Sequence, residues 1–459
     1  MSRATLEQRA EQALSNADER DEALAAEFGS PGEPVRALQS VRKPSLADSL
    51  AHHLTPLSEE DLALAELPDP HAFEGDGTGL FPVGEVTVIG SPGREGKTST
   101  LVALAIAYAL GRTVAGCAPR HGTDVVVYSA EDSRKQFARK LRAQTARMTA
   151  GDAATAIARI RVPDLEAPEL RDIRQLITLH ERSPVPAIMV DSLIAALAKL
   201  SDGKRRPGLV FFETASTLTD ADEDNRGHRA LIAALQRIAR ELSVAAVLIH
   251  HTSQAAANNL PDLTISTADI RGATSLVANA RQCFLLVNLG SEDEPFADGD
   301  ARTVLRRAVA PGMSERLAGL VCLDSSKCQD PPPVFFRWHA TAYGPALAEH
   351  NAPSDLAGKR WRKLHEVIRG RRAEMRQEAK DEGRRALVSQ VVRAVARLTE
   401  DGKQATARAV SVAAGKSPTW GTPYLQDAVR DGLLVSREEK VERRRDPAVV
   451  YYLNDSTEF

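Results

Sequence analysis

The segment Val86–Leu110 places the tightest constraint on what this chain can fold into. It reads VTVIGSPGREGKTSTLVALAIAYAL: an apolar β-branched run, a glycine-rich turn, and an alanine- and leucine-rich stretch. The apolar run predicts a strand covered on both faces, and the last stretch predicts a buried helix. Backbone N–H groups at the start of a helix gather anionic oxygens where the side chains are small. The segment therefore predicts a phosphate-binding loop in an α/β fold.

The predicted loop has a lysine and a threonine where such loops use them. Lys97 is expected to reach the β- and γ-phosphates of a nucleotide, and Thr98 to offer its hydroxyl to Mg²⁺. The common spacing G-x-x-x-x-G-K-[ST] puts a glycine where this chain has Ser91, with Gly90 one residue earlier. A surface turn would not explain these two residues at the mouth of an apolar helix. The predicted nucleotide-binding residues are Gly90, Ser91, Pro92, Gly93, Arg94, Glu95, Gly96, Lys97, Thr98 and Ser99, with ATP and Mg²⁺ as the ligands.

Composition narrows the class of protein. The 459 residues carry a formal net charge of −3, and no apolar run reaches the ~18 residues of a membrane span. The N-terminus is charged and has no apolar signal core, which predicts a cytoplasmic protein. The four cysteines are scattered without zinc-like spacing and are expected to be reduced, mostly buried and structural. They are Cys117, Cys283, Cys322 and Cys328.

Two acidic residues follow predicted strands. The run 124–129 predicts a second buried strand, and Glu131 stands just after it, at the sheet edge where such folds bind ligands. The next two residues, Asp132 and Ser133, suit a helix cap instead. The run 187–190 predicts a third strand that ends in Asp191, whose carboxylate would hold Mg²⁺ directly or through water.

A further strand is predicted over 244–249, followed by His250 and His251. Successive strand side chains point to opposite faces, so the two histidines cannot both bind one metal, and a zinc site is not expected. A polar residue at this strand end is placed to sense a γ-phosphate. The following segment, 254–268, is small and polar and predicts a mobile loop, and further strands are predicted at 304–309 and 317–323.

The chain is predicted to contain four parts. Residues 1–75 form a helical arm and linker, 76–345 an ATPase core, 346–385 a basic helical linker, and 386–459 a winged helix of three short helices and a hairpin. From residue 356 onward there are 22 Lys and Arg against 15 Asp and Glu, a difference of +7, whereas the remainder carries −10. This asymmetry favours a polyanion partner for the C-terminal part, with a solvated helical linker as the alternative.

The hairpin tip of the predicted winged helix is rich in arginine. Arg443, Arg444 and Arg445 are the predicted DNA-binding residues, because guanidinium groups suit phosphate contacts. Winged helices also serve as protein-docking modules, so duplex DNA and a replication protein are both candidate partners.

Residues 76–345 resemble the RepA-like family of RecA-fold hexameric helicases of plasmids, phages and integrated elements. Seven blocks carry the resemblance in the family's order. They are GSPGREGKTS, VVYSAEDS, AIMVDSL, DEDNRGHRALIAALQRIARE, VLIHHTSQ, RGATSLVANAR and SSKCQDPPPVFFRW. The resemblance implies a RecA-like ATPase that forms a homo-oligomer, a hexamer in the family, and that binds single-stranded DNA.

The resemblance also assigns roles. Glu131 resembles the catalytic base that polarises the attacking water, and His251 resembles the γ-phosphate sensor. Arg271 and Arg281 are candidates for a finger that reaches the neighbour's nucleotide, with Lys327 as a second cation acting in trans. Related ring helicases have Lys-x-Arg near the last position, whereas this chain has Lys-Cys-Gln there. The segment after His251 resembles the loop that faces single-stranded DNA in the ring channel.

Three functions are therefore open. The first is an ATP-driven helicase or translocase in the replication of a mobile element. The second is a regulatory or recombination ATPase that binds DNA or protein through its winged helix without unwinding. The third is a non-catalytic scaffold, which would leave Glu131 without a role. The segment 254–268 has no Lys, Arg or aromatic residue, so strand binding there has little support from the residues.

Overall fold

The computed structural model describes residues 58–454, apart from 66, 94, 121–123, 201–205, 221–224 and 442–445. The chain divides into two compact units, 1–67 and 68–459. Within the first, the described part holds one short helix, α3 (Glu59–Ala65). The predicted arm therefore lies mostly outside the described residues, as do Arg94 and the arginines 443–445.

The second unit is built on a nine-stranded sheet with the order β14-β13-β12-β11-β3-β10-β9-β5-β6. Six neighbouring strands, from β11 to β6, pair in parallel, and β12, β13 and β14 pair antiparallel at one side. The predicted α/β class with a mostly parallel, RecA-like sheet is therefore confirmed. The strands are β3 (Val86–Ser91), β5 (Val125–Ser129), β6 (Ile160–Arg161), β9 (Leu209–Glu213), β10 (Ala245–His251), β11 (Gln282–Gly290), β12 (Leu317–Ser325), β13 (Val334–Thr341) and β14 (Gly344–His350).

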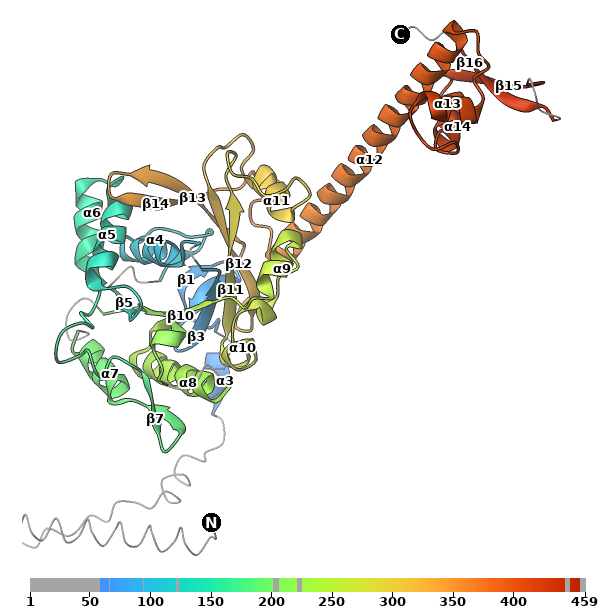
Figure 1. The fold of residues 1–459 in the computed structure, drawn as a ribbon. Helices are drawn as coiled ribbons and strands as arrows, with labels where there is room; N and C mark the ends of the chain where they lie inside the picture. Colours follow the sequence, from blue (N-terminus) through green and yellow to red (C-terminus); the bar gives the residue numbers. More distant parts are fainter. Residues whose placement is uncertain are drawn as a thin grey trace, which may run out of the picture. The chain divides into compact units, whose positions relative to one another are not determined.

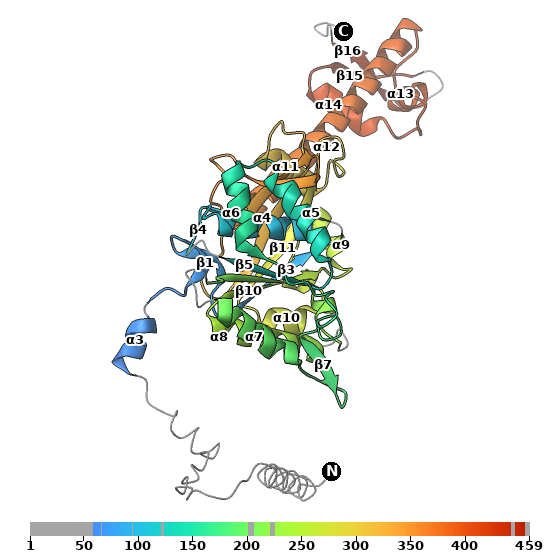
Figure 2. The ribbon, with the colours of Figure 1, turned by 90° about the vertical axis from the view of Figure 1, so that its left-hand side faces the viewer.

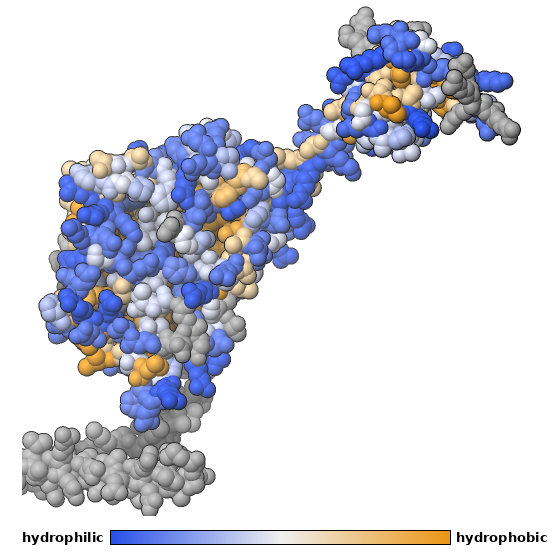
Figure 3. Space-filling view, viewed as in Figure 1, coloured by the Kyte–Doolittle hydropathy of each residue, from blue (hydrophilic) through white to orange (hydrophobic). Residues whose placement is uncertain are grey.

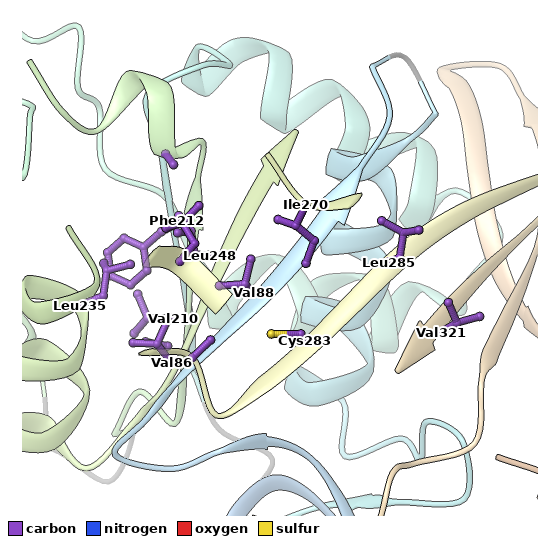
Figure 4. Close-up of a cluster of buried hydrophobic side chains, with 14 of the residues drawn as sticks. Val86, Val88, Val210, Phe212, Leu235, Leu248, Ile270, Cys283, Leu285 and Val321 are labelled. Atoms are coloured by element: carbon purple, nitrogen blue, oxygen red, sulfur yellow. The ribbon is translucent and has the colours of Figure 1, made fainter. Parts of the chain in front are cut away.

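Helices cover both faces of this sheet. Figure 2 shows α4 (Lys97–Ala109), α5 (Arg134–Thr145) and α6 (Ala150–Arg159) on one face, and α7 (Ile188–Leu200), α8 (Asn225–Leu242) and α10 (Ala273–Asn279) on the other. The central strands are therefore mostly apolar and buried, and alternate residues enter two separate cores. On β3, Val86 and Val88 pack toward α8, whereas Ile89 packs toward α4. Figure 4 shows the first of these cores, where side chains from β3, β9, β10, β11 and β12 lie on the same side of the sheet as Leu235 of α8.

Smaller elements surround the sheet. A three-stranded sheet joins β1 (His71–Gly75), β2 (Thr78–Pro82) and β4 (Ala118–Pro119), and β7 (Ile177–His180) pairs with β8 (Ser183–Pro186). The remaining helical turns and helices before the C-terminal part are η1 (Ala215–Thr217), α9 (Ala256–Asn259), η2 (Leu260–Asp262), η3 (Thr267–Asp269) and α11 (Ala301–Val309).

Two predicted strands are wrong. The run 187–190 enters α7 instead, and its buried residues Met189, Val190, Leu193 and Leu197 recur at helical spacing. The run 304–309 lies in α11, which Asp300 caps by accepting a hydrogen bond from the backbone N–H of Arg302. A short apolar run does not by itself distinguish a strand from a buried helix segment, and both errors have that cause.

The C-terminal part begins with a single helix of 40 residues, α12 (Trp361–Glu400), which Figure 1 shows unbroken. It takes up residues 361–385 of the predicted linker together with the first helix of the predicted winged helix, whereas residues 346–350 of that linker lie in β14. Its start packs into the core through Trp361, Leu364 and Ile368. Its end shares a separate apolar cluster with α13 (Ala407–Ala413), α14 (Thr422–Arg430), β15 (Leu434–Glu439) and β16 (Ala448–Leu453). Helices and a hairpin thus follow in the predicted order.

The surface shown in Figure 3 is mostly hydrophilic, with scattered apolar side chains. No helix in the described part of the chain is both long and apolar enough to cross a membrane.

Candidate nucleotide site

The glycine-rich turn lies between β3 and α4, as the sequence predicts. Gly96 precedes α4 with φ +85°, a left-handed conformation that glycine adopts without strain. It lies against the indole of Trp338 on β13, since a Cβ at this position would lie 2.3 Å from Trp338 Cζ2. Beside it, Glu95 accepts a hydrogen bond from Arg316 at 2.5 Å, and the Arg316 guanidinium lies 5.4 Å from the Trp338 ring centroid. The antiparallel strands therefore support the loop from the side.

Gly96→Ala is expected to weaken ATP binding about tenfold or more, because a left-handed alanine costs roughly 1–2 kcal/mol and its methyl group would displace Trp338. Titration with a fluorescent ATP analogue would measure the loss. Gly93→Ala is the matched control, since a Cβ at Gly93 meets nothing within 4 Å. An equal loss in both variants would mean that any side chain in the loop blocks the phosphates, and that the contact with Trp338 is irrelevant.

Lys97 brings two of the predicted catalytic residues together. Its ammonium lies 2.5 Å from Glu131 Oε2 and 3.4 Å from His251 Nε2. Lys97 is buried, whereas the Glu131 side chain is 37% exposed. Glu131 follows β5 and His251 ends β10, so both lie at the carboxyl ends of parallel strands. The structure thus gathers these three residues where the sequence predicts.

Strand alternation adds a residue that the sequence analysis missed. On β9, Leu209 and Phe211 face α4, and Glu213 shares their side. Thr98 Oγ1 donates to Glu213 Oε1 at 2.6 Å, and Ser129 Oγ donates to Oε2 at 3.1 Å. The Glu213 side chain is fully buried, and this burial raises the pKa of its carboxyl, although the hydrogen bond from Thr98 acts to lower it. Glu213 is therefore the acidic partner of the loop threonine.

The structure contradicts the metal-binding role predicted for Asp191. This residue lies in the first turn of α7, on the opposite face of the sheet from α4. Its side chain is 65% exposed and forms an ion pair with Arg237 of α8 at 2.7 Å. The same signal, an apolar run that ends in an acid, is present at Leu209–Glu213. No strand was predicted over that run, so the metal-side acid was assigned to the wrong element.

The two adjacent histidines separate as predicted. His251 faces Lys97, whereas His250 faces α8, where its ring centroid lies 5.8 Å from that of His228. His250 is fully buried, and neither of its ring nitrogens has a hydrogen-bond partner. Burial, with repulsion from nearby cationic groups, lowers the pKa of His250 to about 3. His250 is therefore a neutral core residue next to the candidate sensor.

The two candidate fingers and the second candidate trans cation lie at opposite ends of the parallel strands. The backbone N–H of Arg271 donates to the His251 carbonyl at 3.0 Å, so Arg271 lies near its own subunit's loop. Arg281 instead precedes β11 and its guanidinium lies 3.7 Å from Glu85, at the start of β3. Lys327 follows β12 and lies 3.3 Å from Asp69. Arg281 lies a strand length, roughly 16 Å, from the loop of its own chain.

The segment after His251 is more ordered than predicted. It folds into α9, η2 and η3, and buries Leu260 and Leu263 in the core. Asp269 fixes it by accepting a hydrogen bond from Asn259 at 2.7 Å, and Arg372 of α12 pairs with Asp262 at 2.7 Å. The predicted loop at 254–268 therefore contains short helical turns that are anchored in the core.

The residues at the loop fit Mg²⁺. Mg²⁺ takes oxygen ligands and is usually held by one or two protein groups together with substrate phosphates. Thr98 and Glu213 supply a hydroxyl and a carboxylate in contact with each other. The described residues contain no group of three or more His, Cys, Asp or Glu that could hold a metal by themselves. The donor set therefore suits a cation that binds together with its nucleotide.

Fold and site define a P-loop ATPase core. The family model of an AAA domain matches residues 54–257, which include β3, β5, β9 and β10 and thus Lys97, Thr98, Glu131, Glu213 and His251. The strands β11–β14 and the C-terminal part lie outside the match. None of the curated proteins compared with the chain matches it.

Proposed function

We propose that the chain is a ring-forming ATPase that uses hydrolysis to move along single-stranded DNA, as a helicase or translocase in the replication of a mobile element. One observation carries the proposal. The loop, Glu131 and His251 lie at the carboxyl ends of the parallel strands, whereas Arg281 and Lys327 lie at the amino ends. A head-to-tail ring brings these two ends together, so hydrolysis becomes coupled to the position of the neighbour.

The chain's own residues account for hydrolysis. Lys97 holds Glu131 before substrate binds, and the phosphate oxygens of ATP compete for its ammonium. Glu131 then accepts the proton of the attacking water, and His251 contacts the γ-phosphate. Thr98 and Glu213 would hold Mg²⁺, which neutralises charge on the phosphate oxygens. A cation from the neighbouring subunit would stabilise the charge of the transition state.

The test is steady-state ATP hydrolysis with and without single-stranded DNA, on the wild type and Glu131→Gln. We expect DNA to stimulate the wild type, and the variant to lose about 100-fold or more in turnover with or without DNA, as removal of a general base predicts. Nucleotide binding by the variant serves as the control for folding. Turnover that depends on Glu131 but ignores DNA would overturn the translocase and favour the alternative.

The alternative is a regulatory or recombination ATPase that does not unwind DNA. The segment 254–268 favours it, because Ala256, Leu260 and Leu263 anchor it in the core and it includes no Lys or Arg to hold a phosphate chain. In that case the C-terminal helices and hairpin, interpreted as a winged helix, would provide the contact with DNA or with a replication protein. The predicted phosphate contacts at 443–445 belong to this part.

The ring itself predicts complementation in trans. Lys97→Ala and Arg281→Ala are each expected to abolish most turnover alone, because one removes the loop cation and the other the neighbour's cation. A mixture restores interfaces with both residues intact, at about one quarter of the total for random assembly. ATP hydrolysis of mixed subunits measures this, and Lys327→Ala replaces Arg281→Ala in a parallel mixture. No recovery in either mixture would contradict an active site shared between subunits.

A further inference from the structure

Polar groups surround one cysteine at the amino ends of the parallel strands, away from the phosphate loop. Cys328 follows β12, and its Sγ lies 3.3 Å from Ser325 Oγ. The amide Nε2 of Gln282 donates to the same sulfur at 3.8 Å, and Gln282 is 1% exposed. The thiol itself donates to the Gly79 carbonyl at 3.6 Å. A buried amide and a hydroxyl thus face a single sulfur, which is the arrangement that stabilises a thiolate.

His71 is a further side chain next to Cys328. Its Nδ1 lies 2.8 Å from the Asp69 carbonyl, which can only accept, so Nδ1 carries the hydrogen. The other nitrogen, Nε2, is buried, keeps its lone pair and faces the Cys328 thiol. Burial opposes ionisation of Cys328, but hydrogen bonding with His71 and Ser325 outweighs it and lowers the pKa of the thiol. His71 is therefore placed to accept the proton.

The other three cysteines differ from Cys328 in their burial and in the direction of their pKa shift. Cys117, Cys283 and Cys322 are at most 2% exposed. Burial raises the pKa of Cys117 to about 11 and of Cys283 to about 12, and it raises that of Cys322 further. They match the buried structural cysteines that the sequence predicts. Cys328 does not match that prediction, because it is partly exposed.

We propose that Cys328 is a reactive thiol that peroxides oxidise. The thiolate attacks one peroxide oxygen, so that an S–O bond forms and the O–O bond breaks. The sulfur is oxidised to a sulfenic acid, the peroxide is reduced, and the second oxygen leaves as hydroxide, which takes a proton from the imidazolium of His71. Gln282 and Ser325 hold the sulfur in place during the attack.

The position of Cys328 gives the oxidation a consequence, which rests on the proposed function. Its neighbour Lys327, the candidate trans cation, pairs with Asp69. Its other neighbour Gln329 is fixed to the β1–β2 hairpin, because its carbonyl accepts a hydrogen bond from Thr78 at 2.9 Å. An added oxygen changes the hydrogen bonds of the sulfur with Ser325, Gln282 and Gly79, at a residue that lies between these two contacts. Oxidation at Cys328 is therefore expected to reduce the hydrolysis that depends on a neighbouring subunit.

Reactivity is tested without ATP. The folded full chain is treated with iodoacetamide, and the alkylation rate of each cysteine is followed by peptide mass spectrometry across a pH series. Cys328 is expected to react about tenfold or more faster than each of the other three, because thiolate fraction sets the rate. Ser325→Ala and His71→Gln should shift its pH profile upward. A thermal melt shows whether each variant is folded. Equal rates for all four cysteines, or an unchanged profile in a folded Ser325→Ala, would overturn the proposal.

The consequence is tested with hydrogen peroxide. Peroxide should lower the ATP turnover of the wild type and leave that of Cys328→Ser unchanged, and dithiothreitol should restore the wild type. If Cys328 is selectively oxidised and turnover does not change, the link to Lys327 is wrong while the reactive thiol stands. If the untreated chain hydrolyses no ATP, the proposed function fails, and the alkylation result still decides on the thiol.

Discussion

Glu213→Gln is expected to reduce ATP turnover by about 1000-fold, because it removes the carboxylate in contact with the loop threonine and weakens the Mg²⁺ site. The side chain keeps its shape, so Thr98 retains an oxygen to donate to. Steady-state hydrolysis across a Mg²⁺ titration measures the effect, and the residual activity should require much higher Mg²⁺. Asp191→Asn is the matched control. It breaks only an exposed ion pair with Arg237 and should leave turnover near that of the wild type.

The same pair of variants decides whether Glu213 or Asp191 is the carboxylate that binds Mg²⁺. A loss in Asp191→Asn with normal turnover in Glu213→Gln would restore the role that the sequence alone predicted.

The pH dependence of the free energy of unfolding gives a second test of Glu213. Burial raises the pKa of Glu213, so the unfolded chain releases this proton at lower pH than the folded one. The wild type should therefore lose stability as pH rises from the ordinary carboxyl pKa toward the raised one. Glu213→Gln should not show this loss.

The case of Asp191 and Glu213 shows what sequence can and cannot decide. The phosphate loop was predictable because its function requires particular residues at a fixed spacing, and strand, turn and helix must follow in order. The acidic residue proposed to bind the metal was not predictable, because Ala187–Val190 and Leu209–Phe212 are both short apolar runs followed by an acidic residue. Only the wider context tells them apart: apolar residues recur at helical spacing through Leu197 in the first case, and a polar 3-10 turn follows the second.

Strand alternation explains why other parts were predicted correctly. Once β10 is known to lie beside β3, His251 must face α4 and His250 must face α8. The continuity of α12 was harder to predict, since its exposed middle is held by helix propensity and charge rather than by a buried face. The compact fold of 254–268 depends on long-range contacts such as that between Arg372 and Asp262. Such contacts have no signal in the local sequence.

His250 should make the folded chain sensitive to acid. Its pKa falls from 6.5 to about 3 on folding, because burial and the nearby His228, His251, Arg271 and Lys97 disfavour the charged ring. The unfolded chain therefore takes up a proton below pH 6.5 that the folded chain refuses. The corresponding stability is fully present above pH 6.5 and is lost progressively as pH falls toward 3. Between pH 7 and pH 5 this amounts to about 2 kcal/mol.

His250→Phe isolates this contribution, because it keeps a ring against His228 and removes the titrating nitrogens, neither of which has a hydrogen-bond partner. Urea unfolding at pH 7 and pH 5 would measure it for the wild type and the variant. The variant should lose about 2 kcal/mol less than the wild type between the two pH values. His180→Gln, at an exposed position, should lose as much as the wild type. An equal loss in all three proteins would mean that His250 is protonated in the folded state. His250, which lies between His251 and α8, would then be charged, and the candidate sensor His251 would contact phosphate next to the His250 imidazolium.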